Sequence, residues 1–263
     1  MYTKAELINQ IKEMGIKPDD TVVIHTSMRA VGKVEGGADT VIDAFCECLT
    51  DGLFVVPTHT WDRVYADQPV FDVKNTESCL GALPNCVLRR ENGCRSLHPT
   101  HSVWAYGKNA KEFIKGEEKV TTPAPQGSVW ARLGDVGAKI LLIGVSHDKN
   151  TFIHSVDELG CVPDRLSPDG YNTVLIDKNG NRINGVMHGH KCSKCDDVSK
   201  FYVNFDKAFT KLEAQTFGKL GDATVRVVDA RKCREIVLRI YSRINPDICT
   251  DYNDIPEEIY MKE

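Results

Sequence analysis

The sequence predicts an α/β fold: a three-layer α/β/α sandwich with a mixed central sheet, formed by a single domain over residues 1–263. Short β-branched or apolar runs alternate with segments whose apolar residues recur at helical spacing, the pattern of helices layered on a sheet. The run at 139–143 is largely apolar, as in strands that helices cover on both faces. A hairpin pattern at 173–185 adds antiparallel strands, which favours a mixed sheet.

The first part of the chain predicts a helix, a strand, a loop and a second helix. Residues 1–16 have the spacing of an amphipathic helix, and a turn-forming Lys-Pro-Asp-Asp run then precedes a β-branched strand at 21–25. Residues 26–37 are polar and contain glycine, as expected of a loop. Residues 38–49 again place apolar side chains at helical spacing. This order is typical of the start of a layered α/β domain.

The remaining elements follow the same alternation. Residues 52–61 predict a strand that ends at a proline, and residues 94–107 lead from a loop into a third strand. The fourth strand is the apolar run at 138–144. The hairpin has Asn-Gly in its turn, and residues 223–244 predict a strand that continues into a helix. We find no internal repeat and no linker, so one domain is expected.

The composition favours a soluble, cytoplasmic protein. Hydrophobic residues make up 41% and charged residues 27% of the 263 positions, as in ordinary globular proteins. The net charge is −4 without a basic block, which argues against nucleic acid as a partner. The sequence shows neither a secretion signal nor a run long enough to span a membrane. The ten cysteines are therefore expected to be reduced thiols, mostly buried.

The strand-to-helix connection at 21–49 is the first candidate site. Its small and polar residues expose backbone N–H groups before a helix N-terminus, an arrangement that suits phosphate. It matches neither the Walker motif nor the G-x-G-x-x-G dinucleotide motif. An ordinary turn, with Gly36 and Gly37 giving backbone freedom, explains the same residues.

Four stretches of the chain together resemble one enzyme family. They are VIHTSMRAVGKVEGGADTVIDA, CRSLHPTHSVWAYGKNA, PQGSVWARL and ILLIGVSHDKNTFIHSVDE, in this order along the chain. Each resembles a motif of the aminoglycoside 3-N-acetyltransferase family, and the similarity runs from about residue 5 to residue 240. The resemblance implies that family's α/β fold, which differs from the commoner N-acetyltransferase superfamily.

The resemblance implies that acetyl-CoA is the cosubstrate and that two segments bind it. In the family the first loop holds the phosphates and the pantetheine, and a later segment runs beside the pantetheine arm. Met28 stands where leucine is usual, which a backbone contact would tolerate. The positions that match these two segments are His25, Thr26, Ser27, Met28, Arg29, Gly32, Val34 and Gly37, and then His101, Ser102 and Val103.

His154 is the predicted general base. It follows Asn150 and Thr151 at the end of an apolar strand, where open α/β sheets bind their ligands, and it matches the family's catalytic histidine. Helical spacing places Glu158 on the same face, so its carboxylate is the expected partner of the imidazole. Asp157 and the pair Asp196-Asp197 compete for that role. We expect direct acetyl transfer without a metal.

The acceptor implied by the resemblance is the 3-amino group of the 2-deoxystreptamine ring of an aminoglycoside antibiotic. Asp196 and Asp197 are candidates to bind a cationic amine, and the alternative is that they start a solvated helix. His98 is a further candidate for acceptor binding, and it either orients the site or simply hydrogen-bonds its own loop. Another amine is the second possible acceptor, and the protein is expected to be a monomer or a homodimer.

The stretch MHGHKCSKCDD departs from the family pattern and supports an alternative function that is not acetyl transfer. His188, His190, Cys192 and Cys195 are residue types that bind zinc, but all four lie within eight consecutive residues and lack a second knuckle. A redox C-x-x-C lacks its usual βαβ context here. The alternative to an acetyltransferase is therefore a non-catalytic zinc-binding or redox protein, and whether these residues bind a metal or face the substrate stays open.

Overall fold

The computed structural model describes residues 1–245 and 254–261, and its centre is a seven-stranded sheet. The strand order is β4-β5-β2-β1-β6-β10-β9. Strands β2, β1 and β6 are mutually parallel, whereas β4, β5, β10 and β9 pair antiparallel with their neighbours. The predicted mixed sheet is confirmed. The strands are β1 (Thr21–Thr26), β2 (Leu53–Pro57), β4 (Cys94–Arg95), β5 (Val103–Gly107), β6 (Lys139–Ile143), β9 (Gln215–Leu220) and β10 (Ala223–Asp229).

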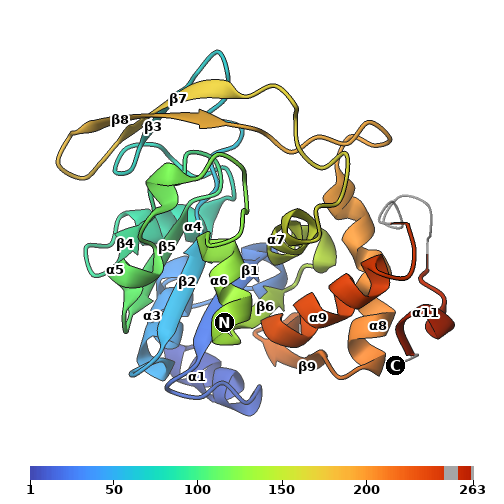
Figure 1. Cartoon of the computed structure of the whole chain (residues 1–263). Helices are drawn as coiled ribbons and strands as arrows, with labels where there is room; N and C mark the ends of the chain where they lie inside the picture. The colour runs from blue at the N-terminus through green and yellow to red at the C-terminus, as the bar shows by residue number, and fades with distance from the viewer. Residues whose placement is uncertain (246–253, 262–263) are drawn as a thin grey trace.

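The predicted hairpin exists, but its assignment to the central sheet is wrong. Strands β7 (Tyr171–Ile176) and β8 (Arg182–Met187) pair antiparallel, and β3 (Val70–Asp72) pairs parallel to β7. These three strands form a separate sheet at the top of the molecule (Figure 1). The separate sheet packs around its own small apolar cluster of Val64, Phe71 and Leu175. The central sheet is mixed because antiparallel strands lie at its two edges.

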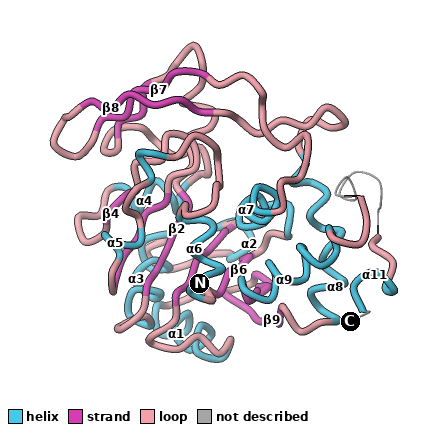
Figure 2. The backbone as a smooth tube through the Cα atoms, in the orientation of Figure 1, coloured by secondary structure: helices cyan, strands magenta, loops and turns pink. Residues whose placement is uncertain are grey.

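Helices cover both faces of the central sheet and complete the predicted three layers (Figure 2). Alternate residues of each strand point to opposite faces, so Val22 and Ile24 join one apolar core and Val23 joins the other. The first face is covered by α1 (Lys4–Glu13), α2 (Met28–Val31), α3 (Ala38–Cys48) and α4 (Ala82–Leu88). The second is covered by α5 (Ala110–Phe113), α6 (Val129–Val136), α7 (Phe152–Leu159), α8 (Asp206–Lys211), α9 (Ala230–Tyr241) and α11 (Glu257–Met261).

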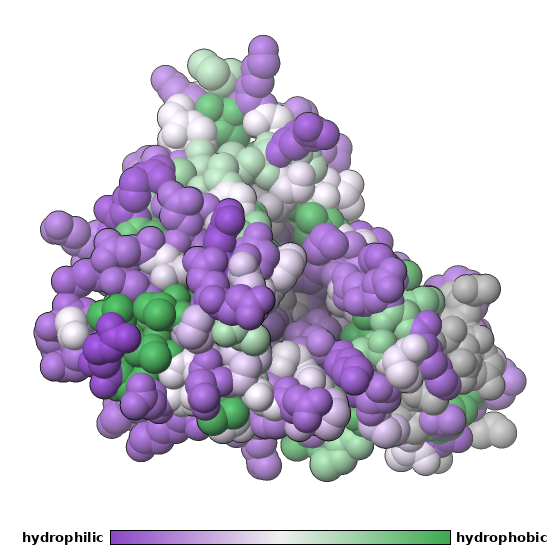
Figure 3. Space-filling view, turned by 90° about the horizontal axis from the view of Figure 1, so that it is seen from above, coloured by the Kyte–Doolittle hydropathy of each residue, from purple (hydrophilic) through white to green (hydrophobic). Residues whose placement is uncertain are grey.

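The described residues also include three 3-10 helices. They are η1 (Glu117–Lys119), η2 (His147–Lys149) and η3 (Val198–Phe205). The surface seen from above is mostly hydrophilic with scattered apolar patches (Figure 3). In the described ranges, no helix combines the length and the apolar character that crossing a membrane requires.

The topology brings three strand ends together at one point. β1 lies between β2, which follows it along the chain, and β6, which comes much later. The chain therefore leaves β1 on one side and returns on the other, and parallel sheets bind ligands at the carboxyl ends of strands where this happens. The segments that follow β1, β2 and β6 are the places to look for a site.

Candidate active site

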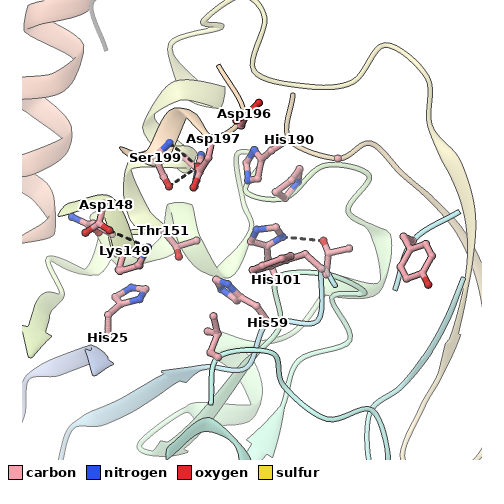
Figure 4. Close-up of a pocket in the computed structure, with 18 of the residues that line it drawn as sticks. His25, His59, His101, Asp148, Lys149, Thr151, His190, Asp196, Asp197 and Ser199 are labelled. Carbon is pink, nitrogen blue, oxygen red and sulfur yellow. Dashed lines mark hydrogen bonds and ion pairs between the residues drawn. The ribbon is translucent and has the colours of Figure 1, made fainter. Parts of the chain in front are cut away.

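A cavity of about 550 Å³ lies at the carboxyl ends of the parallel strands. His25 is near the end of β1, His59 and Trp61 follow β2, and His154 belongs to α7. The segment after β8 covers the cavity from the other side (Figure 4). It contributes Gly189, His190, Asp196, Asp197 and Ser199, and the remaining lining residues are Tyr65, Leu80, Thr100, His101, Pro123, Asp148, Lys149, Asn150, Thr151 and Tyr171.

Five histidines line this cavity and four of them form a chain of ring contacts. The centroids of His59 and His101 are 4.6 Å apart, those of His101 and His190 are 5.1 Å apart, and those of His190 and His154 are 3.9 Å apart. Burial is the main cause that lowers the pKa of each ring, to about 3 for His25 and to about 4 for His190. Neutral imidazoles therefore line the cavity at physiological pH.

His154 is held in one tautomer by Tyr202. The Tyr202 hydroxyl donates its single proton to Asp157 Oδ2 at 2.6 Å, and the same oxygen lies 2.7 Å from His154 Nδ1. Because the hydroxyl has no second proton to give, Nδ1 must carry the hydrogen of this contact and donate it. The lone pair of the neutral ring is then on Nε2. Among the described residues Nε2 makes no hydrogen bond, so it is available to a proton of a bound molecule.

Asp157 is the buried carboxylate that completes this arrangement. Its Oδ1 accepts a hydrogen bond from the Tyr241 hydroxyl at 2.5 Å, and Arg165 Nε lies 3.3 Å from Oδ2. Burial raises the pKa of Asp157, whereas the two tyrosines and the guanidinium favour its charged form. Tyr202 thus connects the Asp157 carboxyl group to the His154 ring.

Glu158 is not the partner of His154, which corrects the sequence-based assignment. Its carboxylate accepts hydrogen bonds from Thr122 Oγ1 at 2.5 Å and from the Ala124 backbone N–H at 2.7 Å. These contacts hold the loop that follows η1 against α7. Helical spacing allows position i+3 or i+4 to share a face with His154, and in this helix the buried residue at i+3, Asp157, is the one connected to it.

The predicted CoA-binding loop after β1 lies partly at the cavity. His25 lines it, and the buried Nε2 of His25 and Oγ1 of Thr26 have no partner within the described residues. Ser27 caps α2, because its Oγ accepts a hydrogen bond from Ala30 N at 3.3 Å. Gly37 adopts a φ of 65° directly before α3, a conformation that favours glycine.

The other residues of this loop that are predicted to bind CoA lie outside the cavity lining. Met28 packs against the first apolar core, and the Arg29 side chain is exposed. Gly32 has a φ of 84°, and a Cβ there would meet the Asp222 carboxylate. Val34 forms a parallel bridge with Tyr2. None of the four lines the cavity.

Ser102 and Val103, which the sequence also predicts to bind CoA, do not line the cavity. The Ser102 hydroxyl is fully buried, donates to Thr58 O at 2.8 Å and receives Arg95 Nε at 3.1 Å. Val103 is fully buried in the second core. The Ser102 hydroxyl thus joins β4 to the segment after β2, and Val103 packs in the core. His101 does line the cavity, and its carbonyl accepts a hydrogen bond from Trp130 Nε1 at 3.0 Å.

His98 hydrogen-bonds its own loop and does not face a substrate. Its Nδ1 accepts the backbone N–H groups of Thr100 at 3.2 Å and His101 at 2.9 Å. Nε2 must then carry the proton, which it donates to Thr122 O at 3.2 Å. With both nitrogens occupied and the side chain fully buried, the assignment of His98 to acceptor binding is wrong. Its loop places His101 in the cavity.

Asp196 and Asp197 line the cavity, and both are exposed. Asp197 also caps η3, since Oδ1 accepts hydrogen bonds from Ser199 N at 3.0 Å and Ser199 Oγ at 2.6 Å. Its helix-start reading from the sequence is therefore confirmed without excluding contact with an amine. The Asp196 carboxylate adds a second negative charge beside it.

The His/Cys stretch is divided by the structure. His190 lines the cavity, whereas His188 Nδ1 contacts Ser167 O at 2.8 Å and does not. Cys195 Sγ lies 2.8 Å from Cys192 Sγ, and both residues pack against the second core. Across residues 1–245 and 254–261, no three His, Cys, Asp or Glu side chains are arranged to hold a metal ion.

Sequence reasoning missed three residues of the site, and two of them, Tyr202 and Tyr241, carried no usable sequence signal. Tyr202 is 48 positions beyond His154, and Tyr241 is 84 positions beyond Asp157, so only the folded chain brings them together. His59 lies two residues beyond a strand that ends in Val-Val-Pro, and the rule that ligands bind at carboxyl ends of strands could have identified it.

Known proteins are similar to this chain in sequence and in fold. Residues 23–242 match the family described as aminoglycoside 3-N-acetyltransferase. Aminoglycoside N(3)-acetyltransferase IV from Salmonella sp is 27% identical over 249 residues, covering 94% of this chain and 88% of that protein. Aminoglycoside N(3)-acetyltransferase VII from Streptomyces paromomycinus is 28% identical over 199 residues, covering 69% of this chain and 68% of that protein.

Solved structures agree with the sequence comparison. Apo aminoglycoside acetyltransferase AAC(3)-IVa superposes with a TM-score of 0.77 at 26% identity, covering 94% of this chain and 91% of that one. AAC-IIIb, solved as a binary complex with CoASH, has the same fold, with a TM-score of 0.78 at 20% identity and coverage of 89% and 94%. Because the family match spans most of the sequence, the chain belongs to the aminoglycoside 3-N-acetyltransferase family of enzymes.

Proposed function

We propose that this protein transfers the acetyl group of acetyl-CoA to an amine of an aminoglycoside, the 3-amino group of the 2-deoxystreptamine ring. Residues 1–263 act as a single acetyltransferase domain. The observation that carries the proposal is the state of His154, a neutral imidazole on the cavity whose Nε2 lone pair is available because Tyr202 and Asp157 hold Nδ1. Family membership and the CoASH complex of AAC-IIIb support acetyl-CoA as the donor.

The proposed reaction is one direct transfer. The amine nitrogen attacks the thioester carbon, and His154 Nε2 accepts a proton from that nitrogen as the N–C bond forms. The C–S bond then breaks, and the protonated His154 returns the proton to the leaving CoA sulfur. Asp157, through Tyr202, stabilises the imidazolium while it exists. None of the residues that line the cavity is a cysteine, which favours direct transfer over an acetyl-cysteine intermediate.

Donor and acceptor would approach from opposite sides of His154. The loop of His25 and Ser27 lies at the carboxyl end of β1, on the side where the resemblance places the donor. Asp196 and Asp197 lie on the covering segment and carry the negative charge that a cationic amine needs (Figure 4). The amine therefore enters from the covering segment and the thioester from the strand ends.

A second acceptor class is favoured by three large apolar or aromatic side chains of the cavity. Trp61, Tyr65 and Leu80 line the cavity although they are 53%, 43% and 36% exposed. Such a wall also suits an amine with a flat or apolar body. The test is a panel of aminoglycosides and arylalkylamines incubated with acetyl-CoA, with release of CoA thiol as the signal. Transfer to none of these amines would contradict the proposed function.

A further inference from the structure

His190 is the cavity histidine that the proposed reaction does not yet use. It lies between β8 and η3, and its ring stacks on His154 with 3.9 Å between centroids and 27° between planes. It also meets His101 edge to face, with 5.1 Å between centroids. Figure 4 shows the side chain directed into the cavity from the covering segment. His190 therefore contacts the base from the side where the acceptor would enter.

Both ring nitrogens of His190 are buried, and neither makes a hydrogen bond of good geometry within the described residues, although the Arg165 carbonyl lies near the ring. Burial lowers the pKa of His190 to about 4, and the Arg165 carbonyl and the Asp197 charge only partly oppose that shift. The ring is thus neutral, with one N–H donor and one lone pair. Unpaired buried polar atoms are costly, and proteins keep them where a ligand completes their hydrogen bonds.

The nature of that ligand follows from the surroundings. In the described part of the chain the His and acidic side chains are not arranged to hold a metal ion, which favours a hydrogen-bonding molecule. An amine that attacks a thioester directs its lone pair at the carbon and keeps two N–H groups. Hydrogen bonds of about 2.9 Å let one nitrogen reach two rings whose centroids are 3.9 Å apart. His154 takes one N–H, and the other needs an acceptor.

We propose that His190 is an acceptor-positioning residue, which accepts a hydrogen bond from the attacking amine and directs its remaining N–H to His154. This inference rests on the proposed function. It gives the His/Cys stretch a role in acceptor binding, and it makes His190 a residue that contributes to the specificity of the reaction.

The test compares three variants by steady-state kinetics and by calorimetric binding of sisomicin to the CoA-bound protein. His190→Leu keeps an apolar side chain against His154 but cannot hydrogen-bond, and His190→Asn restores a donor and an acceptor. His188→Leu is the matched control, because His188 is on the same segment but bonds Ser167 O and does not line the cavity. Melting temperatures report the folded fraction.

His190→Leu should raise the acceptor KM and weaken sisomicin binding about tenfold or more, with the acetyl-CoA KM unchanged. His190→Asn should recover most of this loss, and His188→Leu should resemble the wild type. Equal sisomicin affinity in wild type and His190→Leu would overturn the inference, as would equal losses in the Leu and Asn variants. If the wild type binds sisomicin without acetylating it, the proposed reaction is contradicted. The comparison of sisomicin affinities between wild type and variants would still decide the role of His190.

Discussion

Replacing Tyr202 with phenylalanine tests the connection between Asp157 and His154. The hydroxyl lies 2.6 Å from the Asp157 carboxylate and 2.7 Å from the His154 ring nitrogen, and the variant removes both contacts while keeping the aromatic ring. A hydrogen bond to a charged group contributes about 1.5–3 kcal/mol, and 1.4 kcal/mol is a factor of ten in rate. The acetyl-transfer rate per folded molecule should therefore fall roughly 10- to 100-fold.

Stability and pH dependence should change with the rate. The buried Asp157 carboxylate loses one donor, so the melting temperature should fall by a few degrees. The imidazolium of His154 loses its support, so the acid limb of the pH–rate profile should move to lower pH. The assay is CoA thiol release under saturating acetyl-CoA, corrected for the folded fraction.

Glu158→Gln is the matched control, on the same helix. Its carboxylate holds Thr122 and Ala124, so the variant should lose stability but keep its rate per folded molecule within about threefold. An unchanged rate in folded Tyr202→Phe, together with a large loss in Glu158→Gln, would refute the connection through Tyr202 and restore Glu158 as the partner.

Four further outcomes are expected. Ser27→Trp should weaken CoA binding in calorimetry without unfolding the protein, and an unchanged affinity would remove the donor from the loop after β1. Chelator treatment should leave turnover intact, whereas zinc lost together with activity would contradict a metal-free reaction. Burial lowers the pKa of His154, so the acid limb of the wild-type pH–rate profile should lie below pH 6.5, and a limb above that value would contradict this environment. Burial raises the pKa of Glu117 to about 7, so the proton that the folded state holds favours folding at low pH, and stability should decline between about pH 4.5 and 7 by on the order of 3 kcal/mol. Glu117→Gln should flatten that decline in urea titrations, and an unaltered slope would show that Glu117 does not titrate there.

The sequence predicted the fold because its strands and helices have strong local patterns. The apolar run of β6 and the helical spacing of α3 identify elements that need no tertiary information. The hairpin was also recognised, from its Asn-Gly turn. Its membership in a second sheet was not, because pairing with β3 joins residues about 100 positions apart.

The sequence predicted those cavity residues whose place follows from their position after a strand. It missed the contacts between side chains that only the packing of the folded chain decides. His154 follows β6, so the end of a predicted strand located it. Its partner depends on which acidic side chain α7 buries, and Tyr241 of α9 and Tyr202 of η3 decide that in favour of Asp157. His98 was a candidate for acceptor binding because nothing in the sequence shows that three backbone groups hydrogen-bond to its ring.

The most direct test of the central claim is the acetyl-transfer rate of His154→Ala per folded molecule. The account predicts a fall of roughly 100-fold or more, the scale for losing a positioned general base, with CoA binding nearly unchanged because the donor loop belongs to β1 and α2. The acid limb of the pH–rate profile should vanish with the imidazole. Near-wild-type turnover by folded His154→Ala would contradict the claim and return His154 to a packing role.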